Sequence, residues 1–137
     1  MVNMKNTEKN SKEKVLLLDD DEFLLNMYKV KFTNAGYDVK TSNSGRNAIT
    51  QLEDGLTVSA VIFDIVMPTM NGLEFLDEVK KKKLAKEASF IALTNQGQSS
   101  DVEEAKKLGA DGYIVKASTI PSEVVEEVEK IIKRHKK

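Results

Sequence analysis

The sequence contains no cysteine, no tryptophan, a single histidine and only two prolines among its 137 residues. Without cysteine the chain can form neither a disulfide framework nor a thiolate metal site, and it offers no cysteine nucleophile. An excess of charge is also lacking, because 21 basic residues stand against 22 acidic ones and leave a net charge of −1. No overall field therefore favours binding to nucleic acid or to a membrane surface.

Long apolar segments are missing as well. No run approaches the roughly 18 residues that a membrane-spanning helix needs, and the opening segment MVNMKNTEKNSKEK lacks the apolar block of a signal peptide. We therefore expect a cytoplasmic protein. Residues 1–13 are polar and lysine-rich without periodicity, which predicts a disordered leader. One folded domain is expected over residues 14–133, followed by a basic tail at 134–137.

Within the predicted domain, short apolar segments alternate with amphipathic ones. The runs VLLL, AVIF and FIAL are continuously apolar, which is typical of parallel strands covered on both faces. Apolar residues recur at helical spacing between them, and Gly36 stands where the first helix should end. Strands are expected at 14–18, 37–41, 59–63, 90–93 and 112–115, and helices before Gly36, at 45–53, from 73 into a lysine run, at 100–109 and from about 121.

This strict alternation of β and α segments predicts an α/β fold with a five-stranded parallel sheet and helices on both faces. The common doubly wound, flavodoxin-like arrangement of five strands has the order 2-1-3-4-5. Its crevice lies at the carboxyl ends of the first and third strands. Functional residues are therefore expected directly after the strands.

Carboxylates follow two of the predicted strands. The first strand ends in LLLDDDEF, which puts Asp19 and Asp20 directly after it, and Asp64 follows the third strand. Clustered carboxylates raise one another's pKa values, and a hard divalent cation relieves their repulsion. A set of oxygen ligands without histidine or cysteine fits Mg²⁺ or Mn²⁺ better than Zn²⁺.

A hydroxyl group and a cation are expected beside these carboxylates, at the same edge of the sheet. Thr94 ends the fourth predicted strand and Lys116 ends the fifth. One carboxylate could then attack phosphorus, while the metal, the lysine and the hydroxyl stabilise the transferring phosphoryl group. Asp21 and Glu22 are expected at the start of the first helix, where negative charge suits the helix dipole.

Four motifs, VLLLDDDE, VIFDIVMPTMNG, FIALT and GADGYIVK, resemble in order and spacing the receiver domain of bacterial two-component response regulators, in its stand-alone, chemotaxis-regulator-like form. The resemblance implies phosphorelay signalling in which Asp64 accepts a phosphoryl group from a histidine kinase or a histidine phosphotransfer protein. It also implies that Asp20 and Asp64 bind Mg²⁺ directly and Asp19 through water. The backbone carbonyl of Val66 would be a further ligand.

The same resemblance assigns the remaining roles. Thr94 would move to hydrogen-bond the phosphoryl oxygen, Lys116 would pair with it, and Tyr113 would pack inward as a switch. The domain would be no conventional enzyme, because it would promote only its own phosphorylation and dephosphorylation. Its output surface would be the fourth helix, fifth strand and fifth helix, which would bind an unknown protein target and neither nucleic acid nor membrane.

Two positions depart from the family's pattern. Ala117 stands where proline usually follows the lysine, often after a cis peptide bond. A cis bond before another residue costs about 3 kcal/mol, so we expect either a trans bond or a strained loop. Asn95 stands where a small residue is common, and we expect it to tune the lifetime of the acyl phosphate together with Val66 and Gln96.

Other segments have simpler interpretations. The lysine run at 80–83 lies at a helix C-terminus, where cations are favoured, and lacks the interleaved aromatics of a nucleic-acid surface. His135 is expected in a frayed tail. The helix predicted from Ser100, with Glu103 as its capping-box partner, offers little apolar surface, so it should be weakly held and able to move in switching.

Two other functions remain open from the sequence. One is a Mg²⁺-dependent phosphohydrolase with an aspartyl nucleophile, although enzymes of the haloacid dehalogenase type carry a second aspartate where this chain has Val66. The other is a receiver-like interaction module that no longer switches. The sequence leaves open the kinase, the target, and whether the chain stands alone or belongs to a longer regulator.

Overall fold

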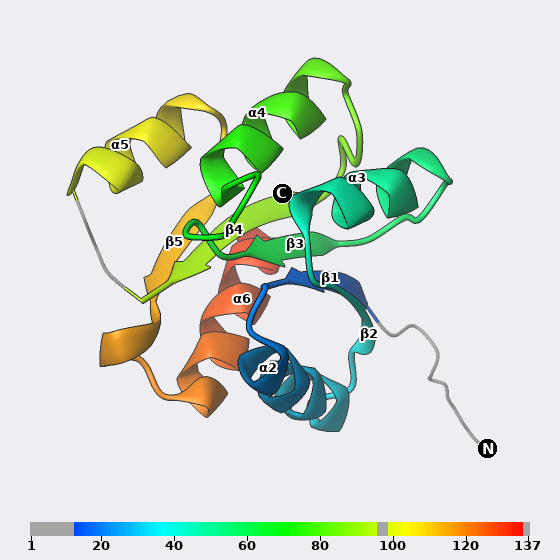
Figure 1. The fold of residues 1–137 in the computed structure, drawn as a ribbon. Helices are drawn as coiled ribbons and strands as arrows, with labels where there is room; N and C mark the ends of the chain where they lie inside the picture. Colours follow the sequence, from blue (N-terminus) through cyan, green and yellow to red (C-terminus); the bar gives the residue numbers. More distant parts are fainter. Residues whose placement is uncertain (1–12, 96–98, 136–137) are drawn as a thin grey trace.

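The computed structural model describes residues 13–95 and 99–135 (Figure 1). Gln96, most of the predicted leader and the last two residues of the predicted tail lie outside these ranges. Five parallel strands form one sheet in the order β2-β1-β3-β4-β5, which confirms the predicted topology. The strands are β1 (Lys14–Leu18), β2 (Asp38–Ser42), β3 (Ala60–Phe63), β4 (Ser89–Thr94) and β5 (Gly112–Val115).

Helices cover both faces of the sheet (Figure 1). On one face α2 and α6 pack over a core that includes Phe32, Ile62 and Val128. On the other face the core includes Phe63 and Phe75, and α3 and α4 contribute most of its helical residues. The helices are α2 (Glu22–Asn34), α3 (Gly45–Glu53), α4 (Gly72–Lys81), α5 (Ser99–Lys107) and α6 (Pro121–His135), with a 3₁₀ turn η1 at Lys116–Ser118.

The continuous apolar runs are explained by these two cores. All four residues of β3 are buried, and because side chains alternate along a strand, Val61 and Phe63 point into one core and Ala60 and Ile62 into the other. Among the described residues, no helix has the length and apolar content needed to cross a bilayer.

The ends of several elements differ slightly from the prediction. Helix α5 begins at Ser99, so Ser100 lies inside its first turn and does not precede it. Strand β2 begins at Asp38, and Tyr37 before it packs edge-to-face on Phe32 at 5.5 Å between ring centroids. Gly36, with φ of +99°, follows the C-cap of α2 as predicted.

Helix α6 continues through Arg134 and His135, which we expected in the basic tail. Cations are favoured at a helix C-terminus, and His135 Nδ1 lies 3.3 Å from Asp111 Oδ1. This contact ties the last turn of α6 to the residue before β5. The frayed tail predicted for His135 is therefore wrong.

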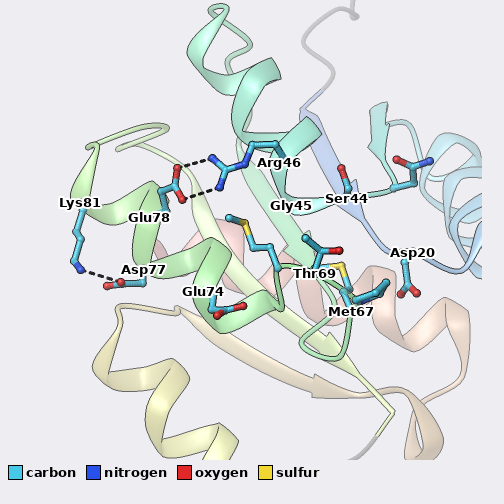
Figure 2. Close-up of a pocket in the computed structure, with 13 residues that line it drawn as sticks. Asp20, Ser44, Gly45, Arg46, Met67, Thr69, Glu74, Asp77, Glu78 and Lys81 are labelled. Carbon is cyan, nitrogen blue, oxygen red and sulfur yellow. Dashed lines mark hydrogen bonds and ion pairs between the residues drawn. The ribbon is translucent and has the colours of Figure 1, made fainter.

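Helices α3 and α4 are joined at the surface by ion pairs. The Arg46 guanidinium donates to both carboxylate oxygens of Glu78, at 2.8 and 3.3 Å (Figure 2). Lys82, just after α4, lies 2.9 Å from Glu53 and 3.1 Å from Glu78. These contacts hold the two helices at a defined separation.

The turn after β3 depends on a close backbone approach at Gly72. Its N–H donates to the carbonyl of Ile65 at 2.8 Å. A Cβ atom at this position would lie 2.2 Å from the carbonyl oxygen of Asp64 and 2.8 Å from Cα of Ile65. Only glycine fits here, and this residue fixes the path of the chain behind Asp64.

We expect Gly72→Ala to lower the free energy of unfolding by about 2–3 kcal/mol, because the backbone of Asp64 must move to admit the methyl group. Alanine's better helix propensity at the start of α4 is too small to offset the clash. Urea unfolding monitored by circular dichroism measures the change. Gly55→Ala is the control, since it has φ of +106° with no atom within 4 Å and should lose only about 1 kcal/mol. Equal losses would contradict the proposed clash.

Candidate functional site

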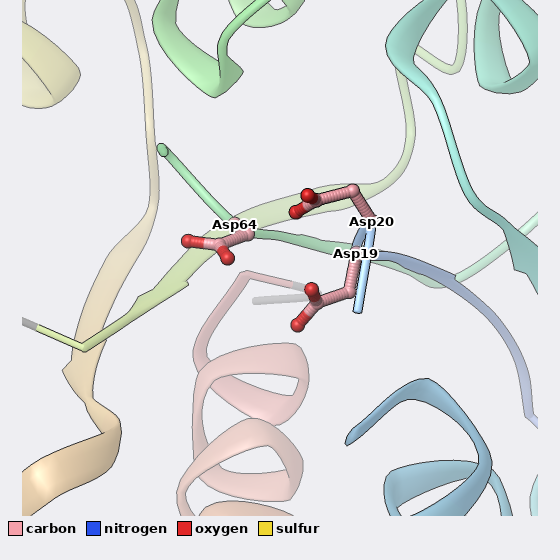
Figure 3. Close-up of side chains that lie close together, drawn as sticks. All are labelled: Asp19, Asp20 and Asp64. Carbon is pink, nitrogen blue, oxygen red and sulfur yellow. The ribbon is translucent and has the colours of Figure 1, made fainter. Parts of the chain in front are cut away.

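Three carboxylates meet at the carboxyl edge of the sheet (Figure 3). Asp19 and Asp20 follow β1 and Asp64 follows β3, and the register pairs Leu18 with Phe63. The N–H of Asp64 continues this pairing by donating to the Leu18 carbonyl at 3.0 Å. One carboxylate oxygen from each aspartate lies within 4.8 Å of the others. The predicted acidic cluster is therefore present.

The cluster lies in a cleft of about 390 Å³. Asp19 is 6% and Asp64 7% exposed, whereas Asp20 is exposed at the rim. The predicted residues Val66, Thr94, Asn95 and Lys116 line the same cleft. Segments far apart in the sequence thus bring carboxylates, a hydroxyl and an ammonium group together.

Lys116 reaches the cluster from the end of β5. Its Nζ lies 2.9 Å from Asp19 Oδ2 and 3.5 Å from Asp64 Oδ2, and the lysine side chain is only 6% exposed. Burial lowers the pKa of Lys116, but the hydrogen bond to Asp19 and the charge of Asp64 outweigh it and leave that pKa above its usual value. The ammonium therefore stays charged between two buried carboxylates.

The surroundings of Asp64 disfavour the ionised form of its carboxyl group. Burial raises the pKa of its carboxyl group; the Lys116 charge opposes this rise and the Asp19 charge adds to it. The N–H of Val66 donates to Asp64 Oδ1 at 3.3 Å and lowers the pKa in part. A cation bound beside Asp64 would stabilise the ionised carboxylate and lower its pKa.

The run of acidic residues divides as predicted. Asp21 is the N-cap of α2, where its Oδ1 accepts from the N–H groups of Phe23 and Leu24 at 3.0 and 3.2 Å. Glu22 is the first residue of the helix. Asp19 Oδ1 accepts from the N–H of Asp21 at 2.9 Å, so the cluster and the helix start are linked by one hydrogen bond.

Thr94 and Asn95 lie together at the end of β4. Thr94 is 2% exposed and Asn95 is exposed at the cleft rim. Tyr113 lies outside the lining of this cleft. It is half-buried on β5 and lines a small cavity with Val102 and Ala105 of α5. Burial raises the pKa of its hydroxyl, and the charges of Asp101 and Asp64 add to that rise.

The loop at Ala117 has an ordinary backbone. It forms the 3₁₀ turn Lys116–Ser118, which is closed by a 3.2 Å hydrogen bond from the N–H of Thr119 to the carbonyl of Lys116. No cis peptide bond occurs among the described residues, so the Lys116–Ala117 bond is trans. This is one of the two outcomes expected from the sequence.

One residue beside the cluster was not recognised from the sequence as part of the site. Tyr28 of α2 has the spacing of a core residue and is 5% exposed, yet it lines a small cavity with Asp19 and Asp64. Burial raises the pKa of its hydroxyl, the Lys116 charge opposes the rise, and the Asp19 charge adds to it. Helical periodicity identifies the buried face but not which distant charges lie against it.

The donor set fits a hard divalent cation. All the candidate ligands are oxygens, and they include three carboxylates within reach of one another. Such a cation prefers one or two carboxylates together with carbonyl oxygens and water. The cluster could therefore hold a metal ion of this kind.

Comparisons with known proteins agree with this geometry. A family model described as the response regulator receiver domain matches residues 15–129. The chain is 34% identical over 123 residues to the response regulator SaeR of Staphylococcus aureus, covering 90% of this chain and 52% of SaeR. It thus spans about half the length of the curated relatives that it matches.

Solved structures agree in fold. The chemotaxis response regulator CheY4 of Vibrio cholerae is 28% identical and superposes with a TM-score of 0.80, over 88% of this chain and 99% of that one. A CheY-like receiver domain protein of Methanospirillum hungatei superposes with a TM-score of 0.83 at 24% identity, over 92% and 98% of the two chains. The second likeness concerns the fold alone.

We expect Asp64→Asn to raise the free energy of unfolding at pH 7 in metal-free buffer, on the order of 1 kcal/mol. The pKa of the Asp64 carboxyl group is higher in the folded chain than in the unfolded one. Its contribution to the free energy of unfolding is therefore fully present below the unfolded pKa and is lost as pH rises through the folded pKa. The gain from asparagine should therefore shrink as pH is lowered toward about 4. Urea titrations at several pH values measure it.

Glu126→Gln, an exposed change on α6, serves as the control and should alter stability by less than about 0.5 kcal/mol. A loss of stability in Asp64→Asn, or a gain that does not vary with pH, would contradict the electrostatic account of the cluster.

Proposed function

The chain belongs to the family of response regulator receiver domains, which serve phosphorylation-dependent signal transduction, and we propose that Asp64 is its phosphoryl acceptor in a Mg²⁺-dependent reaction. The observation that carries this proposal is the meeting of Asp64 with two further carboxylates and the Lys116 ammonium in one cleft. Among the described carboxylates, only Asp19 shares this combination of burial, a facing ammonium and an open cleft.

Asp64 would act as the nucleophile. An oxygen of its carboxylate attacks the phosphorus of a phosphohistidine on a histidine kinase or histidine phosphotransfer protein. The new O–P bond forms as the P–N bond breaks, and the electron pair leaves with the imidazole nitrogen. Lys116, 3.5 Å from Asp64 Oδ2, would neutralise one phosphoryl oxygen, and the Thr94 hydroxyl would donate to another.

The Mg²⁺ ion would be held by Asp19, Asp20, Asp64 and the backbone carbonyl of Val66. The same oxygen donors suit Mn²⁺. When bound, the ion would neutralise charge on the phosphoryl oxygens and on the carboxylates. The chain's own part is to orient Asp19, whose Oδ1 is already engaged by the N–H of Asp21 at 2.9 Å. That contact leaves its Oδ2 for Lys116 or for a metal-bound water.

Switching would follow from movement of Thr94 toward the phosphoryl group. Thr94 pairs with Val115 across β4 and β5, two residues beyond Tyr113. Tyr113 would then pack further inward beside α5, whose only fully buried described residue is Ala105. So weakly held a helix can move at little cost. The changed surface of α5, β5 and α6 would bind a protein target in the cytoplasm, with neither nucleic acid nor membrane as a direct partner.

The competing functions are less well supported. The family is one of signalling domains, and the domain would promote only its own phosphorylation and dephosphorylation. A phosphohydrolase of the aspartyl type needs a carboxylic acid two residues after the nucleophile, and Val66 there is 72% exposed and apolar. A receiver that no longer switches would have no need of a buried lysine held between two carboxylates.

We expect acetyl phosphate or beryllofluoride with Mg²⁺ to modify or bind Asp64, seen by mass spectrometry or by fluorine NMR, and Asp64→Asn to abolish the signal. Asp20→Ala should also abolish it, because a metal ligand is lost. Asp21→Ala should retain it, although the lost helix cap lowers stability by about 1 kcal/mol. Full modification of Asp64→Asn, or equal loss in the Asp20 and Asp21 variants, would overturn the assignment.

Asn95 should tune the lifetime of the acyl phosphate, since it lies exposed at the cleft rim beside Thr94. We expect Asn95→Ala to speed hydrolysis at least about threefold, which is ~0.6 kcal/mol in activation free energy, because a smaller side chain lets water reach the phosphorus. Phosphate release after removal of the donor measures the rate. Val66→Ala, which changes another residue that lines the cleft, should change the rate in the same direction, and unchanged rates in both variants would refute the idea.

A further inference from the structure

A second cavity, larger than the acidic cleft at Asp64, lies beside that cleft. It has a volume of about 750 Å³ and lies between α3, α4 and the loop of residues 65–71 (Figure 2). We refer to it as the α3–α4 groove. Asp20 lines both this groove and the cleft, and the loop on its floor follows Asp64 directly. The groove therefore borders the acidic cluster without being part of it.

The walls of the groove are held in place before anything binds. The bidentate contact of Arg46 with Glu78 spans α3 and α4 at 2.8 and 3.3 Å. On α4 itself, Lys81 pairs with Asp77 at 3.0 Å. Preformed walls reduce the conformational entropy that binding would otherwise cost.

The floor of the groove is formed by methionines. Met67 is 8% exposed and Met70 is half-buried. Gly45 allows Met70 to lie against the start of α3, because a Cβ atom at residue 45 would be 2.7 Å from Met70 Sδ. Flexible, polarizable thioethers adapt to the shape of an apolar side chain placed on them.

The rim of the groove is acidic. Four carboxylates line it, against only two cations, Arg46 and Lys81. Both cations are already paired, with Glu78 and Asp77. Among the described residues Glu74 has no cationic partner, and Asp20 is the proposed metal ligand of the neighbouring cleft. The charge of Glu74 therefore gives the groove a negative potential that favours a positively charged occupant.

The loop of residues 65–71, on the floor of the groove, contains a strained residue. Thr69 has φ of +67°, a left-handed conformation that is unfavourable for a β-branched residue. Its side chain is exposed at the groove. Backbone outliers of this kind cluster at binding and switching sites.

We propose that the α3–α4 groove binds a basic amphipathic segment of a partner protein. An apolar side chain of that segment lies over Met67 and Met70, and its lysine or arginine residues face Glu74 at the rim. The excess of carboxylates selects this occupant over an acidic peptide or a nucleic acid, both of which it repels. Such binding does not require Asp64 to be phosphorylated, so it stands apart from the function proposed above.

The test uses a synthetic amidated peptide with leucines on one helical face and lysines on the other. The chain is labelled with ¹³C at its methionine methyl groups. We expect the Met67 and Met70 signals to shift on titration, while Met27 of α2, which packs with the core on the opposite face of the sheet, stays unchanged. A peptide with the same leucines but glutamates in place of lysines should shift neither groove signal.

Glu74→Gln isolates the charge of the rim. Glutamine can keep the capping contact that Glu74 makes to the N–H of Asn71, so the helix start is retained. The variant should bind the basic peptide at least about threefold more weakly. Glu104→Gln, an exposed change on α5, is the matched control and should bind as the parent chain does.

Three results would overturn the proposal. They are equal shifts by the acidic peptide, unchanged affinity in Glu74→Gln, and shifts of Met27 equal to those in the groove. Concentration-dependent shifts of Met67 and Met70 without any peptide would instead assign the groove to a second copy of this chain, and would also refute it.

Discussion

The contact of the Lys116 ammonium with Asp19 and Asp64 is the interaction on which the functional edge of this molecule depends. Two buried carboxylates next to each other would be costly without a counter-charge. The counter-charge comes from Lys116, the residue directly after β5, and β5 is separated from β1 in the sheet by β3 and β4. The strand order therefore decides which charged side chains lie close together. The cleft depends on this order as well as on which residues the chain contains.

Much of this arrangement could be predicted, because its causes are local in the sequence. The continuous apolar runs indicated strands with two buried faces, and β3 is buried along its whole length. Strict β–α alternation then implied the sheet order and hence the edge where strand ends gather. For that reason the sequence alone could predict that Asp20, Asp64 and Lys116 lie close to one another. The division of LLLDDDEF into a cluster and a helix start followed from counting residues beyond the strand, and the structure adds that Asp21 is the N-cap.

What escaped prediction depends on contacts between distant segments. The position of the Tyr28 hydroxyl beside the acidic cluster arises from how α2 lies on the sheet, which periodicity does not specify. His135 is ordered by Asp111, a residue on another element. The α3–α4 groove is lined by Arg46 and Glu78, which meet across two helices, and the strained Thr69 looks in the sequence like any other turn residue.

The hydrogen bond from the N–H of Asp21 to Asp19 has a consequence for communication along the chain. Asp19 faces the cleft, while Asp21 caps α2. Phe23, two residues after Asp21, is 78% exposed. The cleft and the first turn of α2 therefore share a hydrogen bond, so a displacement of Asp19 would act directly on the start of the helix. If a protein that binds this turn altered the affinity of the cleft for its ligand, thermodynamic reciprocity would require an occupied cleft to alter the affinity for that protein by the same factor.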